Sequence, residues 1–181
     1  MTSNQLEKLK YPIGEFKMLE SYSKLDIVSW MNDIKEFPRK IVDITNSLTE
    51  EELNYQYRPV GWSIKQVVHH CADSHINSIL RFKLALTEEC PTIRPYFEDR
   101  FAMLTDYETS IDSSIKILEG VHYKLGVLFD SFTEVEFQKK FNHPEHNKTF
   151  TLIENIAIYA WHSNHHYAHI KQALRYKGKF E

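Results

Sequence analysis

The chain has 181 residues, of which 42% are hydrophobic and 26% are charged, and its formal net charge at pH 7 is −3. This length suits one well-packed domain, residues 1–181, and is short for two. The charge excludes the basic surface typical of nucleic-acid-binding proteins, and no apolar window approaches the roughly 18 residues of a membrane span. Because the N-terminus is also too polar for a signal peptide, we predict a cytoplasmic protein with no nucleic-acid or membrane partner.

The N-terminal half is predicted to hold two long helices. Residues 1–22 are expected to be irregular because Pro12 and Gly14 interrupt any helix. Residues 23–48 then carry apolar side chains at intervals of three and four, the period of an amphipathic helix, with Pro38 expected to kink it. A short helix should follow Thr49.

The second long helix is predicted over residues 63–88. Ser63 and Gln66 stand three residues apart and form a capping-box signature at its start. Pro91 and Pro95 mark its end. A further short helix is allowed between residues 97 and 107.

The C-terminal half is predicted to add two more long helices, over residues 110–132 and 151–175, with a short turn from Thr133 between them. Thr151 and Glu154 form the capping signature of the last helix. The polar segment 141–150 is expected to be a loop. Four long helices and some short helical pieces predict an all-α four-helix bundle, and we expect up-down-up-down topology, in which the second and fourth long helices run parallel.

The last helix contains the segment WHSNHHYAHI, with four histidines in ten residues. Two ligands on one helix must stand three or four residues apart to share a face. His162 and His166 meet this condition and border the apolar stripe, whereas His165 should face solvent. His165 and His169 also have the spacing. The alternative is a polar helix face whose histidines bond to connecting segments.

A third ligand must come from elsewhere, because a catalytic zinc site usually has three protein ligands. The second long helix offers His69, His70 and His75. Helical periodicity alone favours His75 or His69, since His70 points away from the apolar stripe. No H-E-x-x-H motif supplies the general base of a zincin.

The segments GWSIKQVVHHCADSHINSIL and AWHSNHHYAHI together resemble the DinB-like superfamily and, within it, the YfiT-type metal-dependent hydrolases. The resemblance implies a four-helix bundle, a homodimer, and one divalent metal held by His70, His162 and His166. Only the resemblance selects His70. Asn164 departs locally from relatives that can carry another histidine there, and leaves the three ligand positions intact.

Other residues with reactive or aromatic side chains have ordinary structural interpretations. Asp73, one turn beyond His70, could orient a ligand or accept a proton, or could equally bond to a cap or connector. Cys71 lies in an apolar stripe and should be buried. We interpret Trp62 and Trp161 as packing residues. The remaining histidines, expected on the surface, are His122, His143 and His146.

This metal set indicates a metal-dependent hydrolase acting on a small-molecule substrate. Three neutral imidazoles leave the site's charge near +2, which favours ionisation of a coordinated water with a pKa of about 7 on zinc. Zinc is the first expectation for the metal and nickel the second. Two alternatives stay open. The resemblance to the wider superfamily also implies a metal-dependent thiol S-transferase of the bacillithiol type, which would activate a thiolate in place of water. The second alternative is a non-enzymatic metal-binding scaffold.

Overall fold

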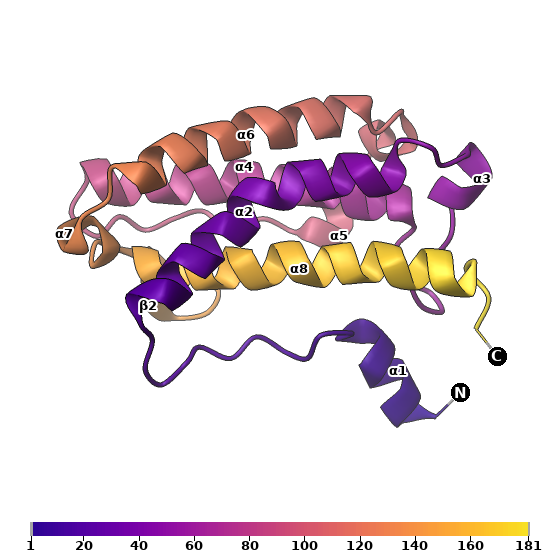
Figure 1. The fold of residues 1–181 in the computed structure, drawn as a ribbon, viewed down its shortest axis with the longest axis horizontal. Helices are drawn as coiled ribbons and strands as arrows, with labels where there is room; N and C mark the ends of the chain where they lie inside the picture. The colour runs from indigo at the N-terminus through magenta and orange to yellow at the C-terminus, as the bar shows by residue number, and fades with distance from the viewer. Residues whose placement is uncertain (1, 181) are drawn as a thin grey trace.

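The computed structural model describes residues 2–180 and consists mainly of four long helices (Figure 1). The long helices are α2 (Lys24–Thr45), α4 (Ile64–Thr87), α6 (Asp112–Asp130) and α8 (Leu152–Tyr176). The short elements are α1 (Ser3–Lys10), α3 (Glu50–Leu53), α5 (Glu98–Phe101), the 3₁₀ helix η1 (Thr105–Glu108), α7 (Glu134–Phe137), β1 (Lys140–His143) and β2 (Lys148–Thr151). The predicted long helices are confirmed to within three residues at each end.

The starts of three long helices follow from local sequence. Helices α2, α4 and α8 each begin at a complete capping box, in which the N-cap side chain and the third helical residue exchange hydrogen bonds with main-chain N–H groups. Those N–H groups would otherwise lack partners in the first turn. The expected boxes at Ser63 and Thr151 are therefore confirmed, and Ser23 with Asp26 forms a third.

The topology differs from the expected up-down-up-down order. Along α4, His69 and His75 contact Ser114 and then His122 of α6, so these two helices run parallel. His70 of α4 faces His162 on α8, and α4 residues further on face earlier α8 residues, so α4 and α8 are antiparallel. The bundle is up-down-down-up, and its second and fourth long helices are antiparallel rather than parallel.

The long connection between α4 and α6, residues 88–111, makes this topology possible. It begins beside the hairpin, where Thr92 bridges to Asn142, and later reaches the first turn of α4, where the side chain of Gln66 donates a hydrogen bond to the carbonyl of Ala102. It therefore returns along the bundle and lets α6 start at the same end as α4 (Figure 1). Parallel neighbouring helices require such a crossover, whereas antiparallel ones need only a short turn.

Two segments expected to lack regular structure are ordered elements. Residues 3–10 form α1, which starts at a capping box between Thr2 and Gln5. The polar segment 141–150 lies mostly in an antiparallel hairpin in which Phe141 pairs with Phe150. The prediction of a loop there was wrong because the strands have four residues each, too few for a periodic pattern to show.

The core is divided into two apolar clusters by a layer of histidines. One cluster includes Ile34, Phe82 and Leu125, and the other includes Phe37, Val68 and Leu118. On α4, α6 and α8 the stretch between the two clusters holds the histidines: His75, His122, His162 and His166. The bundle thus encloses a polar layer between two hydrophobic halves.

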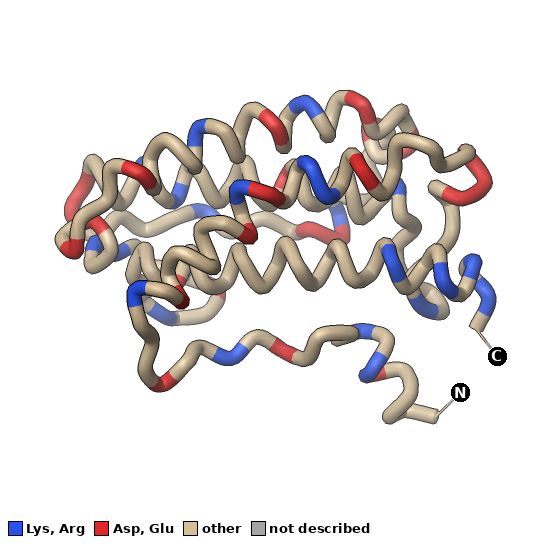
Figure 2. The backbone as a smooth tube through the Cα atoms, in the orientation of Figure 1, with Lys and Arg blue, Asp and Glu red and all other residues tan. Residues whose placement is uncertain are grey.

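Charged residues of both signs are interspersed over the outside of the bundle, but the middle of α8 carries none (Figure 2). Among residues 2–180, no helix has the length and hydropathy needed to cross a membrane. The uncharged stretch of α8 faces protein on most of its circumference, since the N-terminal segment packs along it: Trp161 donates a hydrogen bond to the carbonyl of Gly14.

Candidate metal site

Three histidines converge between α4 and α8. His70, His162 and His166 each offer a ring nitrogen, and these nitrogens all lie within 4.8 Å of one another. The Nε2 atoms of His70 and His162 are 3.3 Å apart. His162 and His166 stand one turn apart on the same face of α8, and the antiparallel α4 brings His70 opposite them.

The three histidines of α4 face three different neighbours. His69 bonds to Ser114 Oγ at 2.8 Å and to the carbonyl of Thr109 at 3.3 Å, on the α6 side. His75 lies at the bundle centre with no exposed surface. His70 points away from the apolar stripe and for that reason faces α8. Periodicity favoured His69 and His75 because it identifies the buried face, and the candidate site lies beside that face.

Burial keeps the clustered imidazoles neutral. Desolvation lowers the pKa of His70 to about 4, with a smaller contribution from His165. Desolvation, followed by repulsion from neighbouring imidazoles, holds the pKa values of His162 and His166 well below the usual range. His70 and His166 are buried, and His162 keeps partial exposure. At neutral pH each ring therefore has a lone pair available.

This donor set fits a divalent metal ion. Two ligand nitrogens at the usual zinc distance of 2.0–2.1 Å in a tetrahedral site would be about 3.4 Å apart, close to the 3.3 Å between His70 and His162. Imidazole nitrogen is a common ligand for zinc, nickel, iron and copper. The cluster found among residues 2–180 contains three side chains, the number typical of catalytic rather than structural zinc sites.

A further set of histidines lies directly behind the cluster. His75 Nε2 is 3.1 Å from His162 Nδ1, and His75 Nδ1 is 2.6 Å from His122 Nε2. His169 Nδ1 is 3.4 Å from His166 Nδ1, and its Nε2 bonds to the carbonyl of Lys10 at 2.9 Å. From the sequence, His122 was expected on the surface, and His169 was a candidate only through its spacing from His165.

Two histidines expected to be exposed near the site are buried. His122 was placed on the surface because it stands alone in its helix, but it is 2% exposed and packs against Phe37 and His75. His165 was expected to face solvent and is 7% exposed. The N-terminal segment covers His165 with Tyr11, and Trp161 stacks on its ring at 4.4 Å. A helical wheel of α8 alone contains no sign of this cover.

The two tryptophans that flank the motifs pack against imidazoles. The ring of Trp62 lies 4.6 Å from that of His70, and Trp161 contacts His165 and Phe16. These contacts agree with the interpretation of the two tryptophans as packing residues, and Trp62 holds the ring of His70 by contact.

Asp73 bonds to a connecting segment. Its carboxylate accepts a hydrogen bond of 2.7 Å from the hydroxyl of Tyr107 in η1, and burial raises its pKa. Cys71 is fully buried as predicted, and burial raises the pKa of its thiol. His146 is exposed as expected, whereas His143 is 6% exposed within the hairpin, and burial lowers its pKa to about 4.

The model of the DinB superfamily matches residues 34–170. This range includes all of α4 and α6, the second half of α2 and most of α8. The chain belongs to the DinB superfamily. This match confirms the resemblance inferred from the two histidine segments.

Relatives within this superfamily cover nearly the whole chain. YfiT of Bacillus subtilis is 42% identical over 171 residues, which are 94% of this chain and 96% of YfiT. A protein of Oceanobacillus iheyensis is 40% identical over 168 residues, 93% of this chain and 97% of the relative. Both are named "Putative metal-dependent hydrolase".

A solved structure of YfiT from Bacillus subtilis has the same fold. It superposes with a TM-score of 0.90 at 41% identity, covering 96% of this chain and 99% of that one. It is described as "a probable metal-dependent hydrolase with an unusual four-helix bundle topology". The four-helix bundle is therefore confirmed for this DinB-superfamily chain.

Proposed function

We propose that the protein is a metal-dependent hydrolase in which His70, His162 and His166 hold one divalent metal ion. The observation that carries the proposal is the convergence of three neutral ring nitrogens within 4.8 Å. The names of relatives more than 40% identical support the same reaction class. Zinc is the first candidate for the ion and nickel the second.

A metal bound by three imidazoles would act as a Lewis acid that polarises a carbonyl or similar group and promotes attack by water. The residues of the chain have separate roles in this proposal. The three ligands present lone pairs, and the partial exposure of His162 gives a small substrate a route of approach. Because the site is largely buried, electrostatic interactions with the charge that develops during the reaction are stronger than they would be in water.

Other nucleophiles are poorly placed near this cluster. The Cys71 thiol is buried and its pKa is raised, so little thiolate forms at neutral pH. The Asp73 carboxylate is engaged by Tyr107. The metal site is therefore the favoured reactive centre.

The test begins with protein purified without a nickel column and analysed for bound metal. About one equivalent of zinc or another divalent metal per chain is expected, with hydrolysis of some members of a panel of chromogenic esters, amides and phosphoesters. His70→Ala and His166→Ala should abolish both binding and turnover. His146→Ala, an exposed histidine away from the cluster, is the matched control and should change neither.

The same assay distinguishes the alternatives. Each reaction is repeated with an electrophile such as chlorobimane, with and without a low-molecular-weight thiol. Acceleration only with thiol would replace the hydrolase proposal by a thiol S-transferase. Stoichiometric metal with no turnover, and a His166→Ala protein that loses only stability, would indicate a scaffold.

A further inference from the structure

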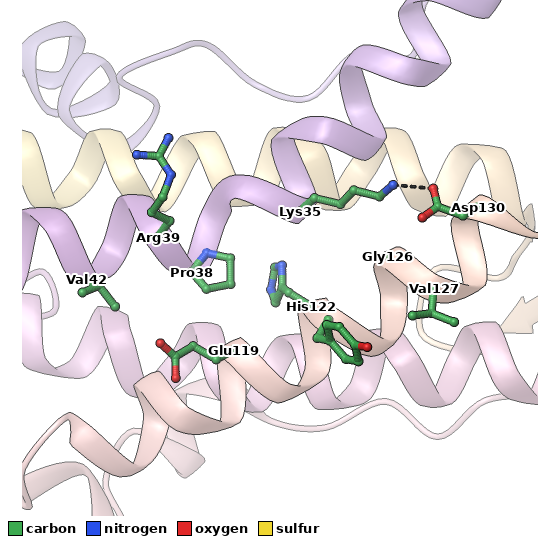
Figure 3. A pocket seen from close by; sticks show the side chains of 10 residues that line it. Lys35, Pro38, Arg39, Val42, Glu119, His122, Gly126, Val127 and Asp130 are labelled. Carbon is green, nitrogen blue, oxygen red and sulfur yellow. Dashed lines mark hydrogen bonds and ion pairs between the residues drawn. The ribbon is translucent and has the colours of Figure 1, made fainter.

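Pro38 leaves a main-chain carbonyl in α2 without its helical partner. In an α-helix the N–H of residue 38 would bond to the carbonyl of residue 34, but proline has no N–H. The Nδ1 atom of His122 bonds to the Ile34 carbonyl instead. Pro38 and His122 line the same pocket of about 520 Å³ between α2 and α6 (Figure 3).

This contact determines where the protons lie on three successive rings. A carbonyl oxygen only accepts hydrogen bonds, so Nδ1 of His122 must carry the proton and its Nε2 must accept. Nδ1 of His75 then donates to His122, and Nε2 of His75 accepts from Nδ1 of His162. Burial lowers the pKa of all three rings and keeps them neutral, so each has one proton, and Nε2 of His162 has none.

The hydrogen bonds from the Ile34 carbonyl through His122 and His75 form one arm, which ends at His162. A second arm of the same kind ends at His166. The carbonyl of Lys10, the last residue of α1, accepts from Nε2 of His169. Nδ1 of His169 is therefore unprotonated and accepts from Nδ1 of His166. This leaves Nε2 of His166 without a proton. Both arms start from a carbonyl that has no helical donor and end at a proposed ligand.

We infer that these two arms, Ile34–His122–His75 and Lys10–His169, fix the tautomers of His162 and His166 so that each presents an unprotonated Nε2 to a divalent cation. His75, His122 and His169 are thereby positioning residues. The inference rests on the proposed metal site, but it concerns proton positions that exist before a metal binds. Hydrogen bonds of this kind behind metal-binding histidines commonly set the tautomer and strengthen the ligand.

The test uses full-length, metal-free protein with ¹⁵N-labelled histidine. Long-range ¹H–¹⁵N correlation spectra should show the Nδ1–H tautomer for His75, His122, His162 and His166, and the Nε2–H tautomer for His169. Nε2–H at His162 in the wild-type protein would overturn the proposal whatever the behaviour of any variant. Because no metal or substrate is present, this result does not depend on hydrolysis.

Variants of His122 test the Ile34–His122–His75 arm at a residue that touches neither His162 nor His166. His122→Phe keeps the ring volume but neither donates nor accepts, so His162 should become a tautomer mixture and zinc affinity should fall about 10- to 100-fold. His122→Gln can donate to the Ile34 carbonyl and accept from His75. This variant should therefore keep the single tautomer of His162 and the zinc affinity of the wild-type protein. His143→Phe, another buried histidine, is the matched control and should leave both unchanged.

The outcomes separate the arms from the proposed function. Unchanged His162 tautomer and zinc affinity in His122→Phe would overturn the arms and leave the hydrolase proposal standing. The expected tautomers in a protein that binds neither zinc nor nickel nor any other divalent metal would overturn the hydrolase proposal instead. If His122→Phe does not fold, the wild-type tautomers and the His122→Gln protein still decide the matter.

Discussion

The two sides of the candidate site are supported in different ways. On α8, Nδ1 of His162 and of His166 each bond to another histidine, which in turn leads to a main-chain carbonyl. On α4, Nδ1 of His70 is buried and has no hydrogen-bond partner among residues 2–180, and the ring is held by its contact with Trp62. One side of the site is fixed by hydrogen bonds and the other by packing, so the proton on His70 is the one free to change position.

Removing a ligand from either side should have the largest effect. His70→Ala and His166→Ala should each weaken zinc binding by more than about 100-fold, since two imidazoles make an incomplete site. The metal-free proteins should differ in stability, because His166→Ala leaves the buried Nδ1 of His169 without a donor, at a cost of about 1–3 kcal/mol. His70→Ala removes a donor from Nε2 of His162, but His162 is only partly buried, so water can replace that donor. Competition with a chromophoric chelator and urea unfolding measure the two quantities. Equal stability of the two variants would remove the distinction between the sides.

Deleting residues 1–14 should affect the α8 side alone. The deletion removes the Lys10 carbonyl that ends the His169 arm, and zinc affinity should fall about 10-fold. The tautomer of His166 should become mixed while that of His162 stays fixed. Leu9→Ala loosens the packing of α1 but keeps the Lys10 carbonyl. It is the control, and it should lower zinc affinity less than the deletion does. A change at His162 in the shortened protein would mean that the arms are not independent.

Loading the metal should move a proton only on the α4 side. In the metal-free protein Nε2 of His70 lies 3.3 Å from the unprotonated Nε2 of His162, so His70 should donate there and carry Nε2–H. Zinc binding would require His70 to shift to Nδ1–H, while His162 and His166 keep their tautomers. The same ¹⁵N spectra, recorded during a zinc titration, check this. A tautomer change at His166 on zinc binding would contradict the contrast between a fixed α8 side and a free α4 side.

Low pH should produce the smallest difference between the α4 and α8 sides, because burial lowers the pKa of histidines on both sides. Desolvation lowers the pKa of His70 to about 4 and that of His169 to about 3. The unfolded chain therefore binds more protons than the folded one once the pH drops below about 6.5, and stability should fall from there towards pH 4. Urea unfolding of metal-free protein between pH 7.5 and 5 measures this loss. His70→Gln and His169→Gln should each flatten the dependence by a similar amount, and a clear inequality would show that hydrogen bonding also contributes.

The helices were predictable because their signals are local. Capping boxes at Ser63 and Thr151, and apolar residues at helical spacing, need only neighbouring residues to be read. The hairpin and α1 were missed since short elements carry little periodic signal. The expected homodimer and cytoplasmic location stay predictions.

The site was only partly predictable from residue spacing. His162 and His166 followed from helical spacing, but His70 came from resemblance, because a wheel shows the face towards the core and not the seam between two particular helices. The topology could have been suspected from the length of segment 88–111, which is long enough to cross the bundle. His122 could have been suspected from Pro38, which always leaves a carbonyl for some other donor.

The sequence by itself determined where the long helices begin and end, which face of each is apolar, and that two histidines share a face of α8. These properties depend on residues within one or two turns of each other. The tertiary structure decided the direction of α4 relative to α8, the choice of His70, and the joining of Ile34 and Lys10 to the site through His122 and His169. Those contacts join residues 88 and 159 positions apart, and only the packing of the helices and the N-terminal segment brings such residues within hydrogen-bonding distance.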